Sequence, residues 1–146
     1  MLTTERLSEL ITAKRRILGQ LRDIGQRQTD LAASGDVGSL LSLLGAKQQL
    51  ISALQDLETS LRPYYAEDPN KRQWPSPEHR AACAQQASEC NALLEEILSF
   101  EKLGAEKLAA RRNEVAQQLQ QMHAAAQVRS AYEAQRRTAN AHSTSV

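Results

Sequence analysis

All four prolines of this chain fall between residues 63 and 77, and they separate two long stretches that contain none. Proline lacks the backbone N–H that a helix needs, and its ring clashes with the preceding turn. Residues 62–76 are therefore predicted to form a loop between long helices. The composition agrees with this prediction. Aromatic residues make up only 3% of the chain, whereas leucine and alanine, which fill the seams between paired helices, are abundant.

The stretch before the loop carries two apolar stripes whose three- and four-residue steps are typical of helices. A threonine cap begins the first helix, Gly35 suits the left-handed position that ends it, and Asp36 caps the second. The helices are predicted over about 4–34 and 36–61, and the short turn between them makes them pack antiparallel. The stripes are Leu7, Ile11, Leu18, Leu21, Ile24 and Leu31, then Leu40, Leu43, Leu44, Leu50, Ile51, Leu54, Leu57 and Leu61.

A third helix is predicted over residues 77–136, because Ser76 is a good cap and Pro77 fits the first helical position. The last residues, 138–146, have no apolar pattern and are expected to be a disordered tail. The predicted fold is therefore all-α, with a single helical coiled-coil domain over residues 1–137. It consists of an elongated antiparallel hairpin and one long third helix, which together form a three-helix bundle with a protruding C-terminal half.

The third helix is predicted to be about twice as long as either helix of the hairpin. Its first part, to about residue 105, can complete a three-helix core. The remainder must project, bend at Gly104 or pair with another molecule. A thin apolar stripe among alanines and glutamines is typical of a helix that binds a partner helix. The candidate partner-binding residues are Leu108, Arg111, Val115, Leu119, Met122, Val128 and Tyr132.

Few side chains suggest catalysis or metal binding. The three histidines are isolated, and there is no glycine-rich phosphate loop. Cys83 and Cys90 lie seven residues apart on one predicted helix, about 10 Å, which is too far for a disulfide. We expect both to be reduced and buried. The sequence thus predicts a protein that is not an enzyme, with no cofactor and no metal site.

Three of the five aromatic side chains, Tyr64, Tyr65 and Trp74, fall in the predicted loop. They either form a contact patch for a partner or fold over the end of the bundle. The second arrangement is favoured, because three exposed rings would invite aggregation.

Charge is unevenly distributed along the third helix, although the whole chain carries a net charge of only +1. Residues 78–101 have a net charge of −4 and residues 102–137 one of +4, which we interpret mainly as solvated helix faces. The short basic patches Lys14-Arg15-Arg16 and Arg111-Arg112 have no aromatic neighbours for stacking, so they indicate nucleic-acid binding only weakly. No apolar run is long enough for membrane insertion and no signal peptide is recognisable, so we expect a cytoplasmic protein.

Two segments resemble one family. The hairpin segment "GDVGSLLSLLGAKQQLISALQDLE", with Lys47 between leucines, and the later segment "AAAQVRSAYEAQ" are similar to those of FlgN-type flagellar export chaperones. The resemblance covers roughly residues 5–135. It implies a cytoplasmic chaperone that holds hook-associated (hook–filament junction) proteins before type III export and delivers them to the export apparatus. It also implies that the C-terminal part of the chain binds amphipathic terminal helices of these secreted proteins.

Two other functions remain open at this point. The chain could be a structural coiled-coil adaptor or an oligomerisation module, in which the C-terminal half forms a homo-oligomer. Less favoured is a helical protein associated with nucleic acid through the segment of net charge +4.

Overall fold

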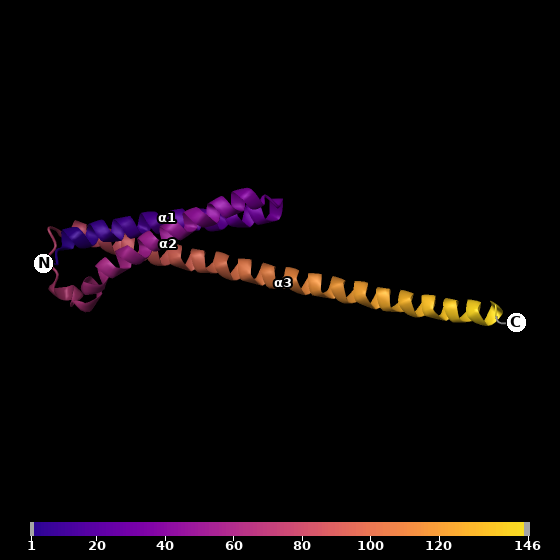
Figure 1. Cartoon of the computed structure of the whole chain (residues 1–146). Coiled ribbons are helices and arrows are strands. Elements are labelled where there is room, and N and C mark those ends of the chain that lie inside the picture. The colour runs from indigo at the N-terminus through magenta and orange to yellow at the C-terminus, as the bar shows by residue number, and fades with distance from the viewer. Residues whose placement is uncertain (1, 145–146) are drawn as a thin grey trace. The chain divides into compact units, whose positions relative to one another are not determined.

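The computed structural model describes residues 2–144 of the chain, and the side chains of residues 2–140. Almost all of these residues are helical and none forms a strand (Figure 1), which confirms the predicted all-α class. By contact the chain divides into two units, Met1–Gly104 and Ala105–Val146. The elements in chain order are α1 (Thr4–Ser34), α2 (Val37–Ala66), the short 3₁₀ helix η1 (Pro69–Lys71) and α3 (Pro77–Thr144).

The helix ends follow the local signals of the sequence. Thr3, Asp36 and Ser76 each accept the backbone N–H of the residue three positions later, at 3.1, 3.0 and 3.2 Å. Gly35 ends α1 with a φ of 76°, a conformation that other residues rarely adopt. The backbone N–H of Ser39, and then its hydroxyl, hold the pKa of Asp36 below its ordinary value. The caps and the turn of the hairpin are therefore as predicted.

The second helix extends five residues further than predicted, to Ala66. Pro63 lies inside it, so the predicted loop 62–76 shortens to residues 67–76. Pro63 has no N–H to donate to the carbonyl of Thr59, so α2 forgoes this one helical hydrogen bond in its last turn. Tyr64 then buries its side chain, which stays only 3% exposed, and this burial stabilises the final turn.

The aromatic side chains near the loop mainly cover the end of the core. Tyr64 belongs to the buried cluster, and Trp74 is half-buried against it. Arg72 fastens the loop by donating to the carbonyl of Tyr64 at 2.7 Å. Tyr65 is 56% exposed, and its hydroxyl accepts a hydrogen bond from Lys14 at 3.4 Å. The favoured interpretation, in which the rings cap the bundle, thus holds for two of the three.

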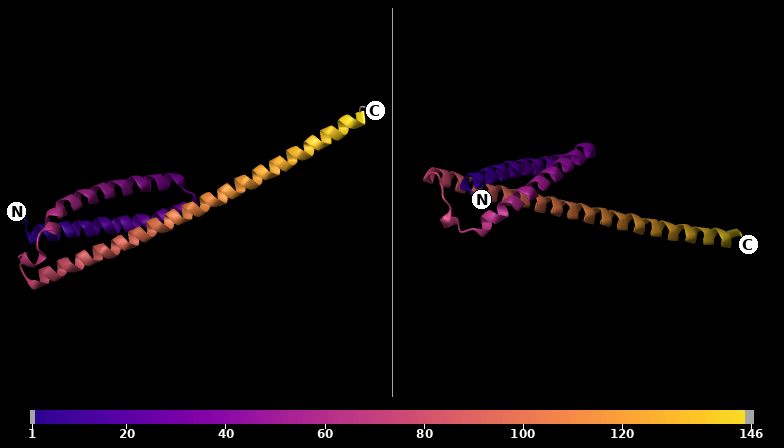
Figure 2. Two further views of the ribbon diagram at one scale, coloured as in Figure 1. Left: turned by 90° about the horizontal axis from the view of Figure 1, so that it is seen from below. Right: turned by 60° about the vertical axis from the view of Figure 1, so that its left-hand side comes forward.

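In the unit 1–104, α1 lies between α2 and the first part of α3 (Figure 2). This position explains why α1 contributes more of the core than α2, although the stripe of α2 contains more leucines. Helix α1 is covered from two sides and contributes five buried side chains, whereas Leu50 and Leu54 of α2 are only half-buried. The fully buried cluster is Leu7, Leu10, Ile11, Leu18, Leu21, Leu61, Tyr64, Cys83 and Cys90.

Helices α1 and α3 run parallel, with a constant offset of 74 residues between their polar contacts. The acidic segment 78–101 therefore faces the basic side of α1. Glu101 also forms an ion pair, with Lys47 of α2. The uneven charge is thus more than a solvated face, because three of the five acids in this segment are paired. The pairs with the shared offset are Thr12 with Gln86 at 2.6 Å, Arg15 with Glu89, and Arg22 with Glu96 at 3.7 Å.

Lys14 is one of the polar residues in the seam between α1 and α2, along with Gln28 and Lys47. Its side chain is only 12% exposed, and its ammonium group lies 2.6 Å from the carboxylate of Glu58. Burial alone would lower the pKa of Lys14. The hydrogen bond to Glu58, together with the charges of Tyr65 and Glu58, outweighs burial and raises this pKa above 10.5.

Both cysteines are buried and free, as the sequence predicts. Cys90 is 1% exposed, and its thiol donates a weak hydrogen bond to the carbonyl of Ile11 at 3.8 Å. Burial raises the pKa of Cys90. Cys83 is somewhat more accessible, at 9%.

Helix α3 continues to Thr144, beyond the end predicted at residue 136. Residues 138–144 are helical, whereas a disordered tail was expected over 138–146; residues 145 and 146 lie outside the described part of the chain. The prediction relied on the missing apolar pattern, but Ala139 and Ala141 favour a helix without any packing. Helical structure also continues through Gly104. Across residues 2–144, no helix has both the length and the apolar character needed to cross a membrane.

Candidate functional site

The unit that begins at Ala105 presents an exposed apolar surface on α3. Every side chain from residue 101 to residue 140 is exposed. Successive residues of an α-helix are rotated by about 100°, so four of its large apolar side chains fall within an arc of about 60°. We call these four residues the apolar stripe. They are Leu108, Val115, Leu119 and Met122, which are 59, 47, 60 and 68% exposed.

The remaining candidate residues do not all share this face. Arg111 borders the apolar stripe, about 50° from its centre. Val128 and Tyr132, 70 and 65% exposed, lie about 110–150° from that centre. The helical geometry therefore brings five of the seven predicted residues together and places these two elsewhere. A count of 3.6 residues per turn along the sequence would have separated these two residues from the other five.

Arginines border the apolar stripe on both sides. Arg111 and Arg112 lie on opposite sides of its first half, at about 50° from its centre. Further along the same face come three arginines that we call the basic end, namely Arg129, Arg136 and Arg137, with Glu133 among them. Among the described side chains, ion pairs occur only between residues 6 and 101. These arginines are thus not engaged by other charged groups of the described chain.

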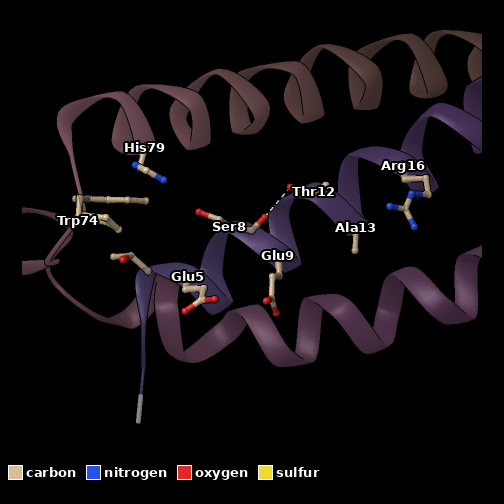
Figure 3. Close-up of a pocket in the computed structure, with 10 residues that line it drawn as sticks. Glu5, Ser8, Glu9, Thr12, Ala13, Arg16, Trp74 and His79 are labelled. Atoms are coloured by element: carbon tan, nitrogen blue, oxygen red, sulfur yellow. Dashed lines mark hydrogen bonds between the residues drawn. The ribbon is translucent and has the colours of Figure 1, made fainter.

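A second candidate site, which is concave, lies in the unit 1–104, where α1, the loop and the start of α3 meet. It is an open groove of about 640 Å³. In Figure 3, Trp74 and His79 point into the space between α1 and α3, and Ser8 lies opposite them on α1. Thr4 closes one end by donating to the carbonyl of Gln73 at 2.8 Å. This groove was not predicted from the sequence, because the residues that meet at its end, Thr4 and Gln73, are 69 positions apart.

The polar groups of this groove are mostly engaged by their neighbours. Glu9 pairs with Arg6 at 3.2 Å, and the ring of His79 forms a hydrogen bond with the hydroxyl of Ser76. Among the described residues, no three His, Cys, Asp or Glu side chains come close enough to hold a metal ion. We therefore regard the groove as a crevice of the bundle and the apolar stripe as the main candidate site.

The basic patch Lys14-Arg15-Arg16 is largely used within the fold. Lys14 pairs with Glu58, and Arg15 pairs with Glu89. Because two of its three charges are already paired within the fold, this patch would bind a phosphate backbone only weakly. The structure thus weakens the case for nucleic-acid binding at this position.

No protein family, curated protein or solved structure matches this chain. The resemblance to FlgN-type chaperones thus stays an expectation that depends on the two segments that suggested it.

Proposed function

We propose that this chain is an export chaperone that binds the amphipathic terminal helix of a secreted protein on its apolar stripe. Following the resemblance, the secreted proteins are flagellar hook-associated proteins, held in the cytoplasm before type III export. The observation that carries the proposal is the exposure of Leu108, Val115, Leu119 and Met122 together on one face of a formed helix. Solvated apolar side chains that line one helix face mark a surface for another helix.

The mechanism is mutual burial. Before assembly, a terminal helix of the secreted protein has an apolar face with no partner, and so does the segment after residue 104. Each large side chain of the stripe contributes roughly 1.5–3 kcal/mol when a partner buries it fully. Because the helix of the chaperone is already formed, little ordering free energy opposes binding on its side. The complex holds the secreted protein unassembled, and no covalent or nucleotide-driven step is needed.

The test compares two faces of the same helix in the full-length chain. Changing Val115, Leu119 and Met122 to glutamine should weaken binding to a hook-associated protein at least tenfold, measured by titration calorimetry. The matched control changes Val128 and Tyr132 to glutamine, because these are equally exposed and lie on another face. Both variants should keep the melting temperature of the parent chain, since none of the five residues is buried. Equal loss in both variants, or none in either, would contradict the proposal.

A shortened chain separates folding from binding. Residues 1–104 contain every buried side chain of the described structure, so this fragment should fold and melt cooperatively. It should nevertheless fail to bind the hook-associated protein. Full affinity in the fragment would place the binding site on the hairpin or in the groove beside Trp74.

Self-association is the second candidate function, and the same stripe favours it. Leu108, Val115 and Met122 repeat every seven residues, the spacing of a coiled-coil seam. Sedimentation of the chain alone distinguishes the two functions. A stable dimer that the three glutamine substitutions dissociate would support an oligomerisation module.

A further inference from the structure

The charges around the apolar stripe are arranged unevenly along the helix. Its first half is bordered by Arg111 and Arg112, and the face then continues into the basic end. All three arginines of the basic end lie within about 70° of the direction of the stripe. Along this face of α3, the apolar stripe is therefore followed by the basic end. Glu133 is the one acidic residue on the face.

The helix dipole does not account for these arginines. Cations are favoured near a helix C-terminus, but the effect fades within the last turn. Helix α3 ends at Thr144, so Arg137 lies about two turns before the end and Arg129 about four. The dipole therefore leaves these three positive charges available to a ligand.

Resting on the proposed function, we infer that the stripe accepts a helix of a different chain whose first two turns are acidic and which lies antiparallel to α3. An antiparallel helix brings its N-terminus beside the basic end. Acidic residues there also suit the dipole of the incoming helix. A parallel helix would need its acids at its C-terminus, where its own dipole disfavours them.

A second copy of this chain is a poor occupant for the same face. Residues 105–137 contain six basic and three acidic side chains, a net charge of +3. Two copies paired through this segment would bring two positive surfaces together, which opposes association. Nucleic acid would satisfy the arginines but leave the apolar residues between them in water. An acidic amphipathic helix satisfies both.

Three synthetic peptides of about 25 residues test the inference on the full-length chain. All share one apolar face. The first carries four glutamates in its opening two turns, the second carries them in its closing turns, and the third has lysines in place of the opening glutamates. By fluorescence anisotropy, the first peptide should bind about tenfold more tightly than the second and the third. The preference should shrink as salt rises, since exposed charge pairs are screened.

Two variants of equal net charge provide the control. Changing Arg129, Arg136 and Arg137 to glutamine should abolish the preference for the first peptide. Changing glutamines at positions 117, 120 and 121 to glutamate lowers the net charge by the same three units on the opposite face, and should leave the preference intact.

Each other outcome identifies what is wrong. Equal binding of the first and second peptides would overturn the antiparallel orientation. Equal binding of the first and third would overturn charge recognition, while the proposed function would stand if a hook-associated protein still binds the stripe. Failure of all three peptides, with dimerisation through the stripe, would overturn both proposals. A single-stranded RNA oligonucleotide that binds more tightly and displaces the first peptide would overturn the inference in favour of nucleic acid.

Discussion

Gly25 of α1 and Phe100 of α3 are in direct contact. A β-carbon at position 25 would lie 3.3 Å from Cδ2 of Phe100 and 3.4 Å from its Cβ. Glycine costs helix stability, so its presence in the middle of α1 needs a reason. The reason is close packing, because the half-buried ring of Phe100 occupies the space that a side chain at position 25 would need.

Filling this space should destabilise the fold. Gly25→Leu is expected to lower the free energy of unfolding by about 1–3 kcal/mol, as overpacking does. In a Phe100→Ala background the same change should cost less, because the ring is gone. Urea unfolding of the four chains gives the coupling energy. Gly45→Ala is the control, since nothing lies within 4 Å of that position, and it should stabilise the chain by about 0.5–1 kcal/mol. A coupling energy of zero would show that the two residues do not touch.

The loss in free energy of unfolding when a leucine is changed to alanine should follow how deeply that leucine is buried. It should not follow how many leucines its helix contains. Leu18 and Leu61 are completely buried, so changing either to alanine should cost about 2–5 kcal/mol. Leu50→Ala and Leu54→Ala should cost less, about 1–2 kcal/mol, because both side chains are half-exposed. Leu98→Ala, at a position 64% exposed, should change the free energy of unfolding by less than about 0.5 kcal/mol. The reverse order in thermal or urea unfolding would mean that α1 is not the central helix.

The two cysteines should differ in their rates of alkylation. The thiolate is the reactive form, and burial both raises the pKa of Cys90 and shields its sulfur. Cys90 should therefore react more slowly than Cys83 in the folded chain, and at the same rate in denaturant. Mass spectrometry of Cys83→Ser and Cys90→Ser chains after timed treatment with iodoacetamide measures both rates. Rapid labelling of Cys90 without denaturant would place it outside the core.

Lys14 should make stability depend on pH in the alkaline range. Its pKa is raised in the folded chain, so its contribution is fully present below about 10.5, the unfolded value, and is lost as pH rises through the folded value. The difference in unfolding free energy between the parent chain and Lys14→Met should therefore fall above about pH 10.5. The hydroxyl of Tyr65 accepts a hydrogen bond from Lys14, so the comparison is repeated in a Tyr65→Phe background to isolate the pair with Glu58. A difference that grows with pH would contradict the assignment.

The sequence predicted features of the fold that depend on a few neighbouring residues. Thr3, Gly35, Asp36 and Ser76 end or begin helices through contacts within four positions, and all of them act as expected. Features that depend on tertiary packing were less accessible. Helix α2 continues past Pro63 because the side chain of Tyr64 is buried there. The neighbouring residues in the sequence do not predict this burial.

The candidate site was predicted in part, for a related reason. Leu108, Val115 and Met122 were found because a seven-residue repeat is visible without a structure. Val128 and Tyr132 were included because they are large and apolar, although the turn of the helix carries them away from the others. The pairing of the acidic segment with α1 could not be read from the sequence. It depends on which helices run parallel, and a charge pattern does not contain that information.

No tight turn joins the parallel helices α1 and α3, so their register along one another must be fixed by side-chain contacts. A slip of one heptad would leave most of the apolar seam covered, yet it would keep only one of the ion pairs made by Arg15 and Arg22. It would also drive Phe100 against the buried Leu18 instead of into the notch at Gly25. Arg15, Arg22 and the space left by Gly25 thus fix the alignment of α3 along α1. They determine how many residues of α3 the hairpin occupies, and hence how many remain for another molecule.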